Sequence, residues 1–326
     1  MTRVRSRRVG AVLFAVLLLA VSSCSRTSDN GVREYVDEAI AGLNEGYYAD
    51  SSTWDDAVNE ALLGLYAAES IPDTYGTLSR LTKIAGGGHS FFETPAQASA
   101  YLEPYPPGWV PTPTVTYDGS VATITIPGFS SSHQDEIDQY LLAAAEVFRS
   151  DSARAACGWI IDLRNNGGGD PRVMLVAVSP LLDDGDVEAF RDRDGSTSNV
   201  NLSGSTVTWD GQEWGPLPGE PAKLPNRPIA ILQSRVTASA AEFVVIAFAA
   251  QEGVETFGSK TGGFTTVNNG FGLPDGALVT LSIALMGDRE GNFYDGPIAP
   301  DHDTDGPGVG TLKTAQDWIA GQCSDR

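Results

Sequence analysis

Two strand-to-helix turns constrain the fold of this chain more than any other feature. Residues 158–163 form a short apolar run that ends in a turn rich in asparagine and glycine, and residues 170–182 then follow a helical pattern. Residues 228–233 form a second apolar run, which leads through a turn of small residues into a helical pattern over 240–251. Strands that alternate with helices favour an α/β core.

The remaining segments fit around such a core. Residues 32–90 are predicted to form a small helical domain, which ends at three consecutive glycines because glycine continues a helix poorly. Residues 91–114 are predicted to be a proline-rich connector and residues 115–326 the core. Within the core we expect a hairpin at 115–126, a helix at 134–150, hairpins and loops over 184–226, strands at 254–257 and 278–286, and a closing helix at 312–321.

The first 24 residues have the pattern of an export signal. Four arginines precede an apolar run, Ala11–Val21, which is too short to span a bilayer and ends in Val-Ser-Ser-Cys24. This ending resembles a bacterial lipobox, in which the cysteine is lipidated, and the alternative is an ordinary cleaved signal with an incidental cysteine. We therefore predict an extracytoplasmic protein anchored to the bacterial cell membrane through Cys24, with residues 25–31 as a tether.

The charge of the chain bears on its partners. The formal net charge is -21, and removal of residues 1–23 removes four arginines and no acid, which leaves -25. A nucleic-acid partner is poorly supported, and anionic headgroups would repel the protein body, so the lipid would hold it at the membrane. Export also permits a disulfide, and Cys157 and Cys323 are either paired or separate thiols.

The glycine-rich turn after residue 163 favours an anion site. Asn165-Asn166-Gly167-Gly168-Gly169 opens a helix, so that free backbone N–H groups of Gly167 or Gly168 converge on one spot. A phosphate loop would end in Gly-Lys-Ser/Thr, which is absent, and this leaves the oxyanion of an acyl-transfer reaction or a plain tight turn.

Ser239 stands at the start of the second helix, between small residues. It is either an N-cap that forms a capping box with Glu242, or an exposed nucleophile held beside N–H donors such as that of Ala240. Only three histidines occur, and His89, directly after the triple glycine, is the natural base for such a serine. Asp295, in a late loop, is a candidate for orienting the histidine or a plain turn residue.

Residues 301–306, Asp-His-Asp-Thr-Asp-Gly, match the first half of a calcium loop. The twelfth position is Leu312 instead of glutamate, so the match fails at the bidentate ligand. No metal and no organic cofactor is predicted.

Together these segments resemble the tail-specific (C-terminal processing) serine peptidases of family S41. The resemblance covers about residues 80–301 and rests on Asp162-Leu-Arg-Asn-Asn-Gly-Gly-Gly169 and Thr237-Ala-Ser-Ala-Ala-Glu242, with support from segments 87–90, 268–276 and 297–301. It implies a crotonase/ClpP-like spiral core of β-sheet and helices. About two dozen residues separate His89 from Val115, too few for the PDZ domain that many members carry.

The family has two catalytic styles, and the sequence favours one of them. Where the Ser–Lys style has its lysine, this chain has Phe264, and Lys260 lies four residues earlier. His89 instead matches the histidine of the tricorn-like and retinoid-binding-protein-like branch, and Asp295 falls near that branch's glutamate if a one-residue gap is allowed. That branch has a serine before the histidine, where this chain has Gly88, and Ser90 is only a possible supporting residue.

The resemblance implies a serine endopeptidase that acts on a peptide or protein substrate. Ser239 would be the nucleophile, His89 the general base, and the N–H groups of Ala240 and of Gly167 or Gly168 the oxyanion donors. The alternatives are a lipid-anchored binding protein that keeps the fold without catalysis, and a crotonase-like acyl-CoA enzyme.

Overall fold

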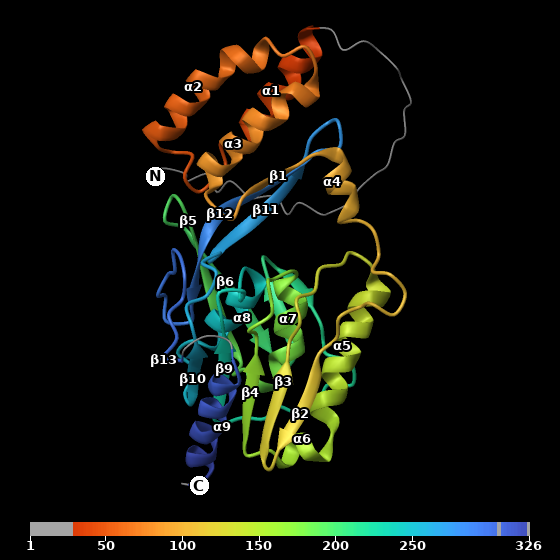
Figure 1. The fold of residues 1–326 in the computed structure, drawn as a ribbon, viewed down its shortest axis with the longest axis vertical. Coiled ribbons are helices and arrows are strands. Elements are labelled where there is room, and N and C mark those ends of the chain that lie inside the picture. The colour runs from red at the N-terminus through yellow and green to blue at the C-terminus, as the bar shows by residue number, and fades with distance from the viewer. Residues whose placement is uncertain (1–28, 305–307, 325–326) are drawn as a thin grey trace, which may run out of the picture.

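A computed structural model describes residues 29–304 and 308–324 (Figure 1). The predicted signal, the lipidation site Cys24, and Asp305 and Gly306 of the candidate calcium loop lie outside these residues. The described part contains a helical group, which forms the upper end in Figure 1, and two β-sheets with their covering helices. It is a mixed α/β fold, as the sequence predicted.

The six-stranded sheet carries the two strand-to-helix turns. Its order is β13-β10-β9-β4-β3-β2, and only β2 runs antiparallel to its neighbour. The strands are β2 (Thr114–Asp118), β3 (Val121–Thr125), β4 (Gly158–Asp162), β9 (Ile229–Gln233), β10 (Val254–Gly258) and β13 (His302–Asp303).

Helices cover both faces of this sheet because its strands are apolar on both sides. Ile161 and Ile231 face the main core, which also contains side chains of α5, α7 and α8, whereas Ile160 and Leu232 pack against α9. The helices are α5 (Gln134–Arg149), α6 (Asp151–Ala155), α7 (Pro171–Val178) with the 3₁₀ turn η2 (Ser179–Leu181), α8 (Ala240–Phe248) and α9 (Val309–Ser324).

The disulfide left open by the sequence is formed between Cys157 and Cys323. It joins the residue before β4 to the end of α9, and thus ties the closing helix to the sheet it covers.

The seven-stranded sheet is antiparallel and has the order β1-β12-β5-β6-β7-β8, with β11 also paired to β12. The strands are β1 (Phe91–Glu93), β5 (Gly185–Asp192), β6 (Thr197–Ser203), β7 (Thr206–Trp209), β8 (Gln212–Trp214), β11 (Thr266–Gly272) and β12 (Leu278–Asp288). The hairpins expected over 184–226 are therefore present as β5–β8.

Strand β12 links the helical group to the rest of the molecule. Val279 and Leu281, in its first half, pack in the helical group's core, whereas Ala284 and Met286, in its second half, belong to the main core. The helical group consists of α1 (Asp29–Leu43), α2 (Ser52–Tyr66), the 3₁₀ turn η1 (Ile71–Thr74) and α3 (Tyr75–Gly86).

Two predicted boundaries differ from the structure. Helix α1 begins at Asp29, inside the predicted tether 25–31. The predicted connector 91–114 contains β1, which pairs with β12, and α4 (Pro95–Ala100), which begins where Thr94 and Gln97 form a capping box. The composition of the connector is dominated by its later prolines, which concealed both short elements.

Candidate active site

Ser239 is held in a strained conformation at the start of α8. It follows the fully buried strand β9 and has φ 54° and ψ -119°, a backbone region that residues with a side chain rarely adopt. Ser239 is also the N-cap residue and forms a capping box with Glu242, so both sequence interpretations describe the same residue. A serine on a strained turn between a strand and a helix has the geometry of a nucleophile elbow.

His89 lies against this serine although 150 residues separate them in sequence. Its Nε2 is 3.0 Å from Ser239 Oγ, and its Nδ1 is 2.9 Å from Thr266 Oγ1. The histidine follows α3 after the glycine turn and is only 9% exposed. The structure therefore brings together the serine and the histidine that the sequence singled out, at the distance that proton transfer requires.

The surroundings of His89 keep its ring neutral. Burial lowers the pKa of His89 to about 4, a hydrogen bond with the Thr266 backbone opposes this shift, and the nearby Lys83 ammonium adds to it. At neutral pH one ring nitrogen therefore has a free lone pair, which is what a proton acceptor needs.

Asp295 does not lie where we expected it. Its carboxylate accepts a hydrogen bond from the Tyr48 hydroxyl at 3.1 Å, and no hydrogen bond joins it to His89 among the described residues. The reason is that β11 begins at Thr266 and places a hydroxyl at Nδ1, while the loop after β12 carries Asp295 toward the helical group.

Glu242 holds the nucleophile turn to the neighbouring loop. Its buried carboxylate accepts hydrogen bonds from Ser239 N at 2.9 Å, Gly263 N at 2.8 Å, Phe264 N at 2.7 Å and the Thr261 hydroxyl. Burial raises the pKa of Glu242 and these four donors counter that rise. Because all four partners donate, we take the carboxylate to be ionised.

The glycine-rich turn packs directly on the nucleophile turn. Asn166 is buried, donates from Nδ2 to Ile126 O at 3.0 Å, and accepts from Ala238 N at its backbone oxygen at 3.2 Å. Its Oδ1 accepts the N–H of Gly168 at 2.9 Å, so this predicted oxyanion donor is already engaged. The N–H groups of Gly167 and Ala240 have no acceptor among the described residues, and these two remain candidates.

The lysine position of the Ser–Lys style is filled by an aromatic ring. Phe264 packs beside the imidazole of His89 with 5.0 Å between ring centroids, and Lys260 is exposed. The group that contacts the Ser239 hydroxyl is therefore the imidazole of His89 and not a lysine.

Of the polar residues behind His89, the sequence identified only Ser90, as a possible supporting residue. Thr266, Asn268 and Ser282 lie on β11 and β12, and Ser90 joins them, since its hydroxyl contacts that of Ser282 at 3.3 Å. The signal that would have found them is the Asp275-Gly276 turn, which indicates a hairpin whose two strands carry these residues.

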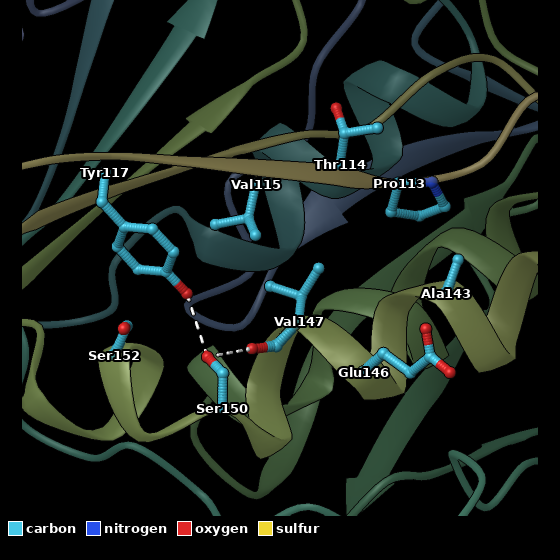
Figure 2. Close-up of a pocket in the computed structure, with 9 residues that line it drawn as sticks. All are labelled: Pro113, Thr114, Val115, Tyr117, Ala143, Glu146, Val147, Ser150 and Ser152. Atoms are coloured by element: carbon cyan, nitrogen blue, oxygen red, sulfur yellow. Dashed lines mark hydrogen bonds between the residues drawn. The ribbon is translucent and has the colours of Figure 1, made fainter.

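Other features of the described residues are not part of this site. Within residues 29–304 and 308–324 there is no cluster of three or more His, Cys, Asp or Glu arranged to hold a metal, and no helix long and apolar enough to cross a membrane. An open groove of about 400 Å³ lies between β2 and α5, where the Tyr117 hydroxyl meets Ser150 at 3.0 Å (Figure 2). It contains none of the residues around Ser239.

The fold and the site define a mixed α/β protein that places a serine hydroxyl against a histidine. Residues 120–304, more than half of the chain, match the model of peptidase family S41, and the chain belongs to this family. A nisin-resistance protein of Lactococcus lactis subsp. lactis is 27% identical over 297 residues, which cover 89% of this chain and 87% of that protein.

Solved structures share the fold. A lipoprotein from Streptococcus agalactiae superposes with a TM-score of 0.74 at 23% identity, covering 93% of this chain and all of that one. The photosystem II D1 C-terminal processing protease superposes with a TM-score of 0.59 at 16% identity, covering 87% of this chain and 94% of that one.

Proposed function

We propose that this chain is an exported serine endopeptidase, anchored to the membrane by a lipid on Cys24, in which Ser239 attacks the peptide carbonyl. The observation that carries the proposal is the 3.0 Å contact between His89 Nε2 and the hydroxyl of a serine in a strained turn. Membership in family S41 supports peptide-bond hydrolysis, and the likeness to a lipoprotein supports a place in the cell envelope.

In this mechanism His89 accepts the Ser239 proton as the acyl-enzyme forms and then gives it to the leaving amine. The N–H groups of Ala240 and Gly167 stabilise the oxyanion, at roughly 3 kcal/mol of barrier for each donor. Water then hydrolyses the acyl-enzyme, again with His89 as the base. The Glu242 carboxylate holds the turn in place through the Ser239 N–H, and its hydrogen bonds go to Ser239 N, Thr261, Gly263 and Phe264 and not to the reacting hydroxyl.

The name of one relative suggests the first substrate to assay. That relative is called a nisin-resistance protein. We propose that nisin, or a compound like it met outside the cell, is a substrate of this chain.

Covalent labelling by a fluorophosphonate tests the proposal on the full-length chain purified in detergent. We expect the wild type and Lys260→Ala to label, and Ser239→Ala and His89→Ala not to label. A folded wild type that neither labels nor cleaves nisin or a peptide library would contradict a peptidase function. Loss of labelling in Lys260→Ala with retention in His89→Ala would move the base to lysine.

The second candidate function is that of a binding protein on the same fold. The observation in its favour is that no carboxylate contacts the Nδ1 of His89 among the described residues. Binding of nisin to a wild type that does not label would support this candidate.

A further inference from the structure

The polar residues behind His89 form a closed ring of hydrogen bonds. The ring runs from His89 Nδ1 to Thr266 Oγ1 at 2.9 Å, to Ser282 Oγ at 2.8 Å, to Asn268 Oδ1 at 2.8 Å, and from Asn268 Nδ2 back to the backbone oxygen of His89 at 3.0 Å. Thr266 is 7% exposed and Ser282 is fully buried. All members except the imidazole are groups that do not titrate.

The direction of every hydrogen bond in this ring follows from one fixed group. The backbone oxygen of His89 can only accept, so the Asn268 amide nitrogen faces it, and the Asn268 oxygen must face Ser282. That oxygen can only accept, so Ser282 uses its single hydroxyl proton on it.

The remaining two bonds are then determined as well. Ser282 Oγ has only lone pairs left, so the Thr266 hydroxyl donates to it, and Thr266 Oγ1 can then only accept from His89. Ser90 fits the same direction, since its hydroxyl donates to Ser282 Oγ while its oxygen accepts the Ser282 N–H at 2.9 Å. The proton of the neutral imidazole therefore lies on Nδ1.

We propose that Thr266, Ser282 and Asn268 are positioning residues that hold His89 in its Nδ1–H tautomer with neutral groups, in place of an orienting carboxylate. This rests on the proposed function for its catalytic meaning. A proton on Nδ1 leaves the lone pair of Nε2 directed at the Ser239 hydroxyl, which is the arrangement that a general base requires. Asn268 sets the direction of the hydrogen bonds in the ring because its Nδ2 can only donate and its Oδ1 can only accept.

A ring of neutral hydrogen-bonding groups differs from a carboxylate in its effect on the protonated histidine. The neutral groups fix the tautomer and the plane of the imidazole, but they add no negative charge that would stabilise an imidazolium. The lowered pKa of His89 agrees with this difference.

Two measurements on full-length variants test the proposal. The first is the ¹⁵N NMR spectrum of the chain labelled with ¹⁵N at its histidines. The sequence has only three histidines, and comparison with His89→Ala assigns the His89 signals. The second is the rate of fluorophosphonate labelling of Thr266→Val, Thr266→Ser and Ser282→Ala. The matched control is Thr82→Val, which removes a fully buried hydroxyl whose hydrogen bond among the described residues goes to Leu78 O in α3.

We expect the wild type to show the Nδ1–H tautomer at neutral pH. Thr266→Val and Ser282→Ala should show a mixture of tautomers and label at least about tenfold more slowly, because a positioned base contributes about 10²–10⁴-fold. Thr266→Ser and Thr82→Val should behave like the wild type. If Thr266→Val does not fold, Ser282→Ala provides the same comparison.

The proposal and the peptidase function fail in different ways. Either of two results would show that the hydrogen-bond ring does not orient His89. One is an Nε2–H tautomer in the wild type. The other is that Thr266→Val and Ser282→Ala both label as fast as the wild type. An Nδ1–H tautomer in a wild type that neither labels nor cleaves nisin or a peptide library would support the ring and contradict the peptidase function.

Discussion

The two halves of the candidate site are built in opposite ways. The nucleophile half consists of two strand-to-helix turns of one sheet, and it carries a buried negative charge, Glu242, which accepts four hydrogen bonds. The base half takes His89 from the end of the helical group and its partners from β11 and β12, and hydroxyl and amide groups hold the imidazole. The charge holds the strained turn, while in the proposed arrangement the histidine is oriented without one.

If this contrast is correct, replacing the charge in the nucleophile half has the largest effect. Glu242→Gln keeps the shape but puts an NH₂ group against donors, so at least one N–H or hydroxyl loses its acceptor. We expect a loss of about 3–5 kcal/mol in the free energy of unfolding, measured with denaturant, and little or no labelling of Ser239. The exposed Glu290→Gln is the control and should change stability by less than about 0.5 kcal/mol.

The second effect concerns how closely the two turns of the nucleophile half pack. A methyl group on Gly168, at φ +109°, would lie 2.9 Å from Ser239 Cβ, whereas one on Gly185, at φ +112°, would meet nothing within 4 Å. Both substitutions to alanine strain the backbone, but only Gly168→Ala displaces the serine. We expect Gly168→Ala to label about 10²-fold more slowly, since a shift of about 1 Å costs that much.

The control for this prediction is Gly185→Ala, which should lose stability but not labelling rate. Equal labelling rates in the two variants would show that Ser239 tolerates a displaced turn, and the nucleophile half would then be less rigid than its contacts indicate.

The third effect concerns a buried glutamate in the seven-stranded sheet, to which β11 and β12 of the base half belong. Glu188, on β5, is fully buried, and neither of its carboxylate oxygens has a hydrogen-bond partner among the described residues. Burial raises the pKa of Glu188 well above its usual value. The folded chain thus keeps a proton that the unfolded chain releases above about pH 4.3, so this group makes stability fall as pH rises from there.

Glu188→Gln removes this dependence. We expect the variant to match the wild type near pH 4 and to be more stable by about 1–4 kcal/mol at pH 7, because the wild type must then take up a proton on folding, at about 1.4 kcal/mol for each pH unit above the unfolded pKa. Denaturant unfolding at several pH values measures the difference, with the exposed Glu213→Gln as the control. A difference that does not grow with pH would mean that Glu188 is ionised in the folded chain.

The contrast between the halves also explains what the sequence could predict. The nucleophile half is local: each strand, turn and helix lies within about 25 residues of sequence, so apolar runs and small turn residues indicated Ser239, Glu242 and the glycine turn. The six-stranded sheet and its helices followed from the same patterns.

The base half is not local, and there the sequence indicated His89 and, as a possible supporting residue, Ser90, which bonds to Ser282. Thr266 and Ser282 are polar residues on strands whose pairing brings them together, and the pairing of β11 with β12 has a register shift after Val267 that no pattern shows. The position of Asp295 was wrongly predicted for the same reason. The sequence places it in a late loop, but it does not show in which direction that loop carries the side chain.

The smallest predicted effect concerns Lys83, a cation near the histidine. The Lys83 ammonium lies over the ring of Phe91 at 3.9 Å from its centroid, donates to Gly88 O at 3.0 Å, and lowers the pKa of His89. Because the base must be neutral to accept a proton, labelling of the wild type should fall on acidification only near pH 4. Lys83→Gln removes a positive charge that opposes protonation, so the pKa of His89 rises and the fall moves to higher pH.

Labelling rates between pH 3.5 and 8, with circular dichroism to confirm folding at each pH, measure this shift. Lys83→Arg keeps the charge and should follow the wild-type profile. If Lys83→Gln and Lys83→Arg give the same profile, the electrostatic influence of Lys83 on His89 is absent, and burial alone keeps the imidazole neutral. If instead the fall in the wild type lies near the ordinary histidine pKa of about 6.5, a negative charge must reach His89, and the contrast between a charged nucleophile half and a neutral base half would be wrong.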